Sequence, residues 1–188
     1  MVRSGITSDT PKRYVVDAGE VRINYQDGND QGSLLGATMD GNEFVIETEI
    51  RDPRPDGARG KVKGLRTYND IAVQLTANLF EITLENLENN LPGVSTSDDG
   101  THQVLSQGVD ISDNDYIDNV AIIGTLSGSD EPIICIVKNA LADDGFELSM
   151  ADRDDVVQAV TFSGHFDPSS LETAPYEIRY PSDLQATT

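Results

Sequence analysis

The stretch Glu43-Phe-Val-Ile-Glu-Thr-Glu-Ile-Arg51 alternates between two kinds of side chain along its whole length. One face carries apolar side chains and a threonine: Phe44, Ile46, Thr48 and Ile50. The other face is mostly charged: Val45, Glu47, Glu49 and Arg51. Because successive side chains of a β-strand point to opposite faces, this pattern predicts a strand with one face in a core and one in solvent.

A second alternating stretch follows at 71–79 and supplies a partner for this strand. Its inward set is apolar throughout: Ile71, Val73, Leu75, Ala77 and Leu79. Between the two stretches lie residues 51–66, whose prolines and glycines exclude a regular helix or a central strand over the first ten positions. The segment is therefore interpreted as a long hairpin loop joining two antiparallel strands.

This loop has an unusual charge for the chain. It carries six basic side chains: Arg51, Arg54, Arg59, Lys61, Lys63 and Arg66. Against the two acidic residues Asp52 and Asp56, these give a net +4 and leave −24 on the rest of a chain whose total is −20. We interpret the loop as a docking element for the acidic surface of a neighbouring subunit, because opposite potentials steer association. The alternative is a solvated loop that offsets local charge.

The overall charge limits the classes of function. Thirteen basic residues stand against 33 acidic ones, which disfavours a nucleic-acid-binding role. The 22 Asp and only 4 Lys are typical of a protein from a high-salt host, with an ordinary acidic protein as the alternative. No apolar run reaches the length of a membrane span, and the start lacks the apolar stretch of a signal peptide, so we expect a soluble protein made in the cytoplasm.

One segment has the periodicity of a helix. In 83–91 the leucines Leu84, Leu87 and Leu91 recur at i, i+3 and i+7, so we expect them to pack on the body of the protein. Thr83 is a suitable N-cap, and Pro92-Gly93 ends the segment.

The remaining segments complete an all-β pattern. We expect a flexible arm at 1–12, short strands at 14–18 and 21–25, a turn at 40–42, a mobile polar loop at 94–108, a hairpin from 120–126 and 132–137, strands at 146–150 and 156–166 around a turn at 152–155, and an extended tail at 167–188. About eight strands and one helix predict a single mainly β domain over 1–188. Its fold class is an antiparallel β-sandwich or barrel with one short flanking helix and long loops.

The chain shows little sign of chemistry. The best cation candidates are the carboxylates of Asp110, Asp113, Asp115 and Asp118, since hard ions need several oxygens close together. A turn that caps the following segment is the interpretation we prefer. No metal-binding or catalytic motif surrounds either histidine, so the sequence predicts neither an enzyme nor a cofactor.

Several stretches, in this order, resemble the tail tube proteins (major tail proteins) of siphophage-like long-tailed viruses. The resemblance runs from about residue 35 to 181 and rests on 57–64, 73–87, 115–124, 137–141, 165–168 and 176–181. It implies a β-sandwich with a flanking helix that assembles into hexameric rings, which stack into a hollow tube. The tube belongs to the virion tail, is assembled in the host cytoplasm, and conducts the genome during ejection.

The same resemblance implies the partners. The main partner is the protein itself, with tape-measure, terminator and baseplate proteins at the tube ends, no membrane, and DNA that passes without specific binding. Glu47 and Glu49 are our candidates for the lumen surface, because a tube that conducts DNA needs an acidic bore. Two alternatives stay open: another virion ring component, such as a terminator or baseplate ring, and a carbohydrate- or ion-binding β-sandwich.

Overall fold

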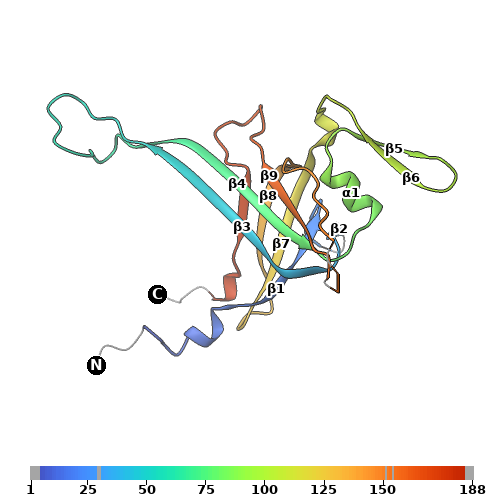
Figure 1. Ribbon diagram of the computed structural model, residues 1–188. Helices are drawn as coiled ribbons and strands as arrows, with labels where there is room; N and C mark the ends of the chain where they lie inside the picture. Colours follow the sequence, from blue (N-terminus) through green and yellow to red (C-terminus); the bar gives the residue numbers. More distant parts are fainter. Residues whose placement is uncertain (1–4, 29–30, 151, 154, 185–188) are drawn as a thin grey trace.

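The computed structural model describes residues 5–28, 31–150, 152–153 and 155–184 (Figure 1). Antiparallel strands are the main regular structure, with one short α-helix, so the predicted fold class is confirmed. The strands of the main sheet are β1 (Val15–Ile23), β2 (Ser33–Leu34), β3 (Thr38–Arg51), β4 (Thr67–Leu79), β7 (Ile117–Leu126), β8 (Ile133–Ala142), β9 (Gln158–Gly164) and β10 (Tyr176–Arg179). Their order is β2-β1-β7-β8-β9-β4-β3, with β10 also paired to β8.

Strand β8 is where this sheet divides into two layers. Its segment from Ile134 to Val137 pairs with β10, whereas its last residues, Ala140 to Ala142, pair with β9. One layer therefore contains β10, β8, β7, β1 and β2, and the other contains β9, β4 and β3. The core lies between them and draws apolar side chains from both layers: Val21, Val73, Leu75, Leu79, Val120, Val137, Val160 and Phe162.

The alternating stretches at 43–51 and 71–79 form β3 and β4. Both strands are confirmed, and both extend beyond the predicted limits. The predicted turn at 40–42 is wrong, because these residues lie inside β3. Asp40 and Gly41 have φ values of 64° and 84°, and the register shifts between Thr38 and Asn42. The chain thus makes a β-bulge here and continues along the same partner strand.

The segment 94–108 also differs from expectation. It forms a separate hairpin from β5 (Val94–Asp98) and β6 (Gln103–Gln107) that projects from the body (Figure 1). Its tip is tied by side chains, since Asp98 accepts a hydrogen bond from the Gly100 N–H at 2.7 Å. Polar side chains on both faces removed the alternation that would have marked it as a hairpin.

The remaining differences concern the ends and one strand. The segment 146–150 is not a strand: it pairs with nothing that the structure describes, and Met150 is 76% exposed. In the predicted turn at 152–155, residues 152 and 153 do form a turn, while 154 lies outside the described residues. The predicted strands at 14–18 and 21–25 are one strand, β1, with a register shift between Val16 and Glu20.

The described parts of both terminal segments are attached to the body more closely than expected. In the predicted arm 1–12, residues 1–4 lie outside the described part, but Thr10–Lys12 forms a short 3-10 helix. The Ser127 hydroxyl donates to the Pro11 carbonyl at 2.7 Å. In the predicted tail 167–188, Tyr176–Arg179 folds back as β10, and 185–188 lie outside the described part. No helix in the described ranges is long and apolar enough to cross a membrane.

Candidate assembly surfaces

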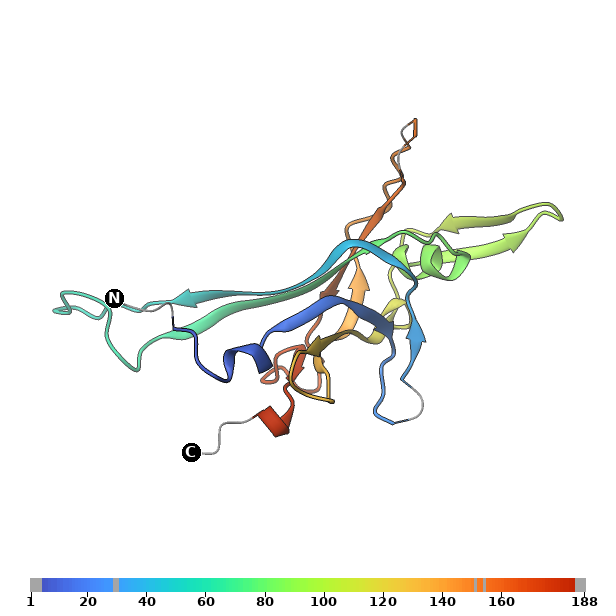
Figure 2. The same ribbon diagram turned by 90° about the horizontal axis from the view of Figure 1, so that it is seen from below.

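The outer half of the β3–β4 hairpin is the most conspicuous surface of the molecule. Strand β4 pairs with β9 only from Gln74 to Leu79, so its residues 67–73 pair with β3 alone. Both views show the hairpin leaving the body and ending in the loop between the strands (Figures 1 and 2). The side chains of 47–51 and 67–70 are all exposed. An isolated two-stranded ribbon is marginally stable in water, so this one lacks the support that a partner would give.

The loop at the end of this hairpin holds the six predicted docking cations, and they are not equivalent. Asp52 forms ion pairs with Lys61 Nζ at 2.9 Å and with Arg66 Nε at 2.6 Å. These contacts, the one from Lys61 above all, hold the pKa of the Asp52 carboxyl below its usual value. Lys61 and Arg66 therefore shape the loop itself. The other four make no ion pair with any residue that the structure describes: Arg51, Arg54, Arg59 and Lys63.

The two lumen candidates lie on β3. Phe44 and Ile46 pack against the core, so the strand alternation turns Glu47 and Glu49 to the opposite face, where both are exposed. Across the hairpin, Glu47 is opposite Ala72, and Glu49 is opposite Asp70. This face of the ribbon is consequently acidic close to the body and basic only at its loop.

The helix α1 (Leu84–Asn90) packs through a different face from the one predicted. Thr83 is its N-cap, as expected, and its hydroxyl accepts a hydrogen bond from Asn86 N–H at 3.1 Å. The prediction for Leu84 is wrong, because 38% of that residue is exposed, while Leu87 and Leu91 are half-buried. The innermost residues are instead Asn86 and Asn90.

A side-chain hydrogen bond that no local sequence pattern indicates sets this orientation of the helix. The Asn86 side-chain amide donates to the Leu35 carbonyl at 2.7 Å and to the Glu81 carbonyl at 3.3 Å. It thereby fixes the short helix to the chain segment that enters β3. A three-leucine pattern over two turns does not reveal which side of so short a helix carries such an anchor.

The acidic run at 110–118 forms a cap, in keeping with the preferred interpretation. Asp115 Oδ2 accepts from the N–H and hydroxyl of Ser112 at 2.6 and 2.8 Å, and Oδ1 accepts from Gly93 N–H at 2.9 Å. These hydrogen bonds, from Ser112 first, lower the pKa of the carboxyl. The other candidates, Asp110, Asp113 and Asp118, do not converge on Asp115. Among the described residues no group of three or more acidic, histidine or cysteine side chains is placed to hold a metal ion.

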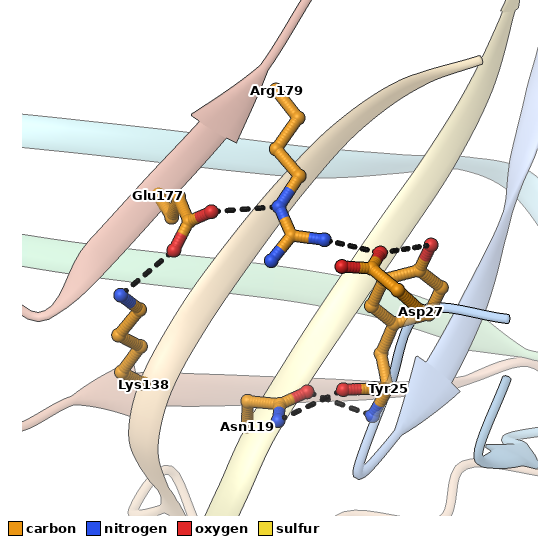
Figure 3. A network of polar contacts seen from close by, with 6 residues as sticks. All are labelled: Tyr25, Asp27, Asn119, Lys138, Glu177 and Arg179. Atoms are coloured by element: carbon orange, nitrogen blue, oxygen red, sulfur yellow. Dashed lines mark hydrogen bonds and ion pairs between the residues drawn. The ribbon is translucent and has the colours of Figure 1, made fainter. Parts of the chain in front are cut away.

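Sequence reasoning missed a polar network that fastens β10 to the sheet (Figure 3). Glu177 accepts from Lys138 Nζ at 2.9 Å and from Arg179 Nε at 2.6 Å, and these contacts lower its pKa, with that from Lys138 the larger cause. Arg179 also pairs with Asp27 and lies over the Tyr25 ring, 5.9 Å from its centroid.

The same network reaches the strand beyond β8. The backbone of Tyr25 exchanges two hydrogen bonds with the side chain of Asn119 on β7, at 2.8 and 3.2 Å. The six residues come from four separate parts of the sequence, so no local signal could have grouped them. They tie β10 to β8, to β7 and to the segment that follows β1.

No protein-family model matches the chain, and no curated protein matches it significantly.

Proposed function

We propose that this protein is a viral structural subunit that assembles with copies of itself into stacked, hexameric rings forming the tail tube of a long-tailed virus. The observation that carries the proposal is the outer half of the β3–β4 hairpin, which pairs with no other strand in the described chain and is exposed on both faces. A ribbon of this length is stabilised when a neighbouring subunit covers it.

The free strand edges support the same function. In the described sheet, β3 has no strand on its outer side, and β2 and β10 are the end strands of the other layer. Open edges present unpaired N–H and C=O groups that a neighbour's strand can pair with. In a ring, β3 of one subunit and an edge strand of the next would join their sheets into a continuous wall around the bore.

The charge distribution fits a conduit for DNA. The chain is strongly acidic, and the exposed Glu47 and Glu49 lie on the ribbon face that turns away from the core. We place this face toward the lumen, where it repels the phosphate backbone and lets DNA pass without binding. The basic side chains gather at the hairpin loop, so they serve contacts between subunits.

The test is assembly of the purified chain, followed by sedimentation velocity and electron microscopy over a range of salt concentrations. We expect rings and tubes with a central channel. Rings that never stack would favour a terminator or baseplate ring, and a chain that stays monomeric at every salt and protein concentration would refute self-assembly.

A shortened hairpin isolates the feature that carries the proposal. Thr48 and Ile71 are paired across the ribbon, so residues 49–70 can be replaced by an Asn-Gly turn that closes the hairpin there. The core and the β4–β9 pairing remain, so the variant should fold with a similar melting temperature. We expect it to form no tubes.

A further inference from the structure

Four large apolar side chains are exposed on two stretches that strand pairing brings side by side: the start of β3, and the end of β4 with the residues that lead into α1. They are Met39, Phe80, Ile82 and Leu84, with exposed fractions of 39%, 48%, 42% and 38%. We call these four residues the apolar corner. Exposed apolar side chains that gather at one place, rimmed by polar groups, are typical of interaction sites.

The backbone brings the residues of the apolar corner close together. Thr38 and Leu79 are paired across the strands, and Leu79 is fully buried, so this pair faces the core. Met39 and Phe80 each follow one member of the pair, and both are exposed. Ile82 comes two residues later, and Leu84 begins α1.

The corner is also held rigidly. Phe80 N–H donates to the Ala37 carbonyl at 2.9 Å, and Ala37 N–H donates to Glu81 Oε2 at 3.1 Å. The Asn86 side chain holds α1 in place through its hydrogen bond to the Leu35 carbonyl. A partner that docks here meets a preorganised surface and loses little entropy in ordering it.

The rim of the corner is acidic. Asp40, Glu43 and Glu85 are exposed beside it, and the chain contains no Lys or Arg between Arg22 and Arg51 or between Arg66 and Lys138. The complementary surface must therefore combine apolar side chains with cations.

The hairpin loop at 52–66 has that combination, and we call it the hairpin tip. It exposes Val62 by 37% and Leu65 by 41%, next to the cations Arg54, Arg59 and Lys63 that have no ion-pair partner in the described chain. The tip and the corner thus match in both apolar character and charge.

We propose that the apolar corner receives the hairpin tip of a second copy of this chain. The inference rests on the proposed function and adds to it the surface on which one ring seats the next. Within one molecule the two sites occupy opposite ends of the same ribbon, about 45 Å apart for the 14 residues of β3 at ~3.3 Å each, so they cannot meet.

This arrangement sets the symmetry of the contact. Tip and corner are different surfaces, so the contact is head-to-tail, and each added copy presents a new free tip and a new free corner. A head-to-tail contact either closes into a ring or continues as a stack. In the proposed assembly the strand edges close the ring, so we assign the tip–corner contact to stacking. The apolar side chains keep the contact in place when high salt screens the ion pairs.

The decisive experiment uses two complementary variants. The corner variant carries Phe80→Ser and Ile82→Ser, and the tip variant carries Arg54→Ser, Arg59→Ser and Lys63→Ser. A matched control, Ile111→Ser with Leu171→Ser, removes two exposed apolar side chains elsewhere. Circular dichroism melting verifies that all three fold like the wild type.

We expect neither the corner variant nor the tip variant to stack alone, while the control assembles normally. In a mixture, the intact tip of the corner variant can dock only on the intact corner of the tip variant. The mixture should therefore form assemblies that contain a single junction. Sedimentation velocity and electron microscopy distinguish these from wild-type tubes.

The outcomes separate the two proposals. Wild-type tubes together with normal tubes from the corner variant would overturn this inference and leave the proposed function standing. A corner variant that fails to stack alone and also forms no junction in the mixture would overturn this inference as well. A wild type that never assembles would overturn the proposed function first.

A cross-link checks the contact directly. In a Cys135→Ser background, which removes the one native cysteine, Val62→Cys combined with Phe80→Cys should give covalent ladders on oxidation. The control pair Val62→Cys with Leu171→Cys should not. Equal ladders from both pairs would contradict the assignment of the corner as the receiving surface.

Discussion

Lys61 Nζ lies 2.9 Å from Asp52 Oδ2, so this contact ties the middle of the basic loop back to the residue at which the loop begins. Arg66 reaches the other oxygen of the same carboxylate at 2.6 Å. The loop is therefore a shaped element in which two cations hold its form. Arg54, Arg59 and Lys63 make no ion pair with a described residue, and in the proposed assembly they are left for contacts with another subunit.

Breaking the two Asp52 ion pairs should loosen the loop and leave the fold intact. We expect Asp52→Asn to melt like the wild type but to be cut faster by trypsin at the loop's Arg and Lys residues, and to assemble more slowly. Asp56→Asn is the matched control, because Asp56 lies in the same loop and makes no ion pair with a described residue. Equal cleavage of both variants would show that the Asp52 ion pairs do not order the loop.

The acidic face of β3 should keep DNA from binding to the tube. Replacing both lumen candidates, Glu47→Lys and Glu49→Lys, should leave tubes that now retain double-stranded DNA at low salt, with retention falling steeply as salt rises. A gel-shift assay on assembled tubes measures this. Replacing Asp130 and Glu131 with lysine makes the same charge change in the exposed β7–β8 turn. If the control tubes retained DNA equally, Glu47 and Glu49 would not be on the lumen.

The Glu177 network predicts a dependence of stability on pH. Contacts from Lys138 and Arg179 lower the pKa of Glu177 in the folded state. Its contribution is therefore fully present above the unfolded pKa of about 4.3 and is lost as pH falls through the lower, folded value. Glu177→Gln should lower the melting temperature at pH 7, and the gap to wild type should close in acid. Glu131→Gln, at an exposed position, should melt like the wild type at both pH values.

The helix anchor can be separated from the leucine pattern. Asn86→Ala leaves the buried Leu35 carbonyl without its donor, which should cost about 1–3 kcal/mol of unfolding free energy. Leu84→Ala removes a side chain at an exposed position and should change that free energy by about 0.5 kcal/mol or less. Urea titration measures both. A larger loss for Leu84→Ala would restore the original leucine-face prediction.

One buried amide offers a route to greater stability. Gln158, at the start of β9, is 1% exposed, and neither polar atom of its side chain has a hydrogen-bond partner in the described chain. Gln158→Met keeps nearly the same shape and removes an unsatisfied amide whose burial costs about 1–3 kcal/mol. We expect a higher melting temperature for Gln158→Met and a lower one for Gln158→Glu. A loss of stability in the methionine variant would indicate a hydrogen-bonded water at this site.

The sequence predicted those parts of the fold that have one face in the core. Strands β3 and β4 were predicted because Phe44 and Ile46 on one strand, and Val73 and Leu75 on the other, recur with the period of a strand. The cap at Asp115 and the N-cap at Thr83 were also anticipated, since such contacts are made within a few residues. Local pattern is sufficient where the physical cause is local.

Tertiary structure decided the rest. The β5–β6 hairpin has no buried face and so no hydrophobic alternation, and the short helix is oriented by Asn86, whose partner Leu35 is 51 positions away. Arg179 meets Asp27 across 152 positions, and the stretches that carry Met39 and Phe80 lie side by side because Thr38 pairs with Leu79, 41 positions away. Side-chain periodicity shows that a residue can be buried or exposed, but only the packed chain determines which distant group it meets.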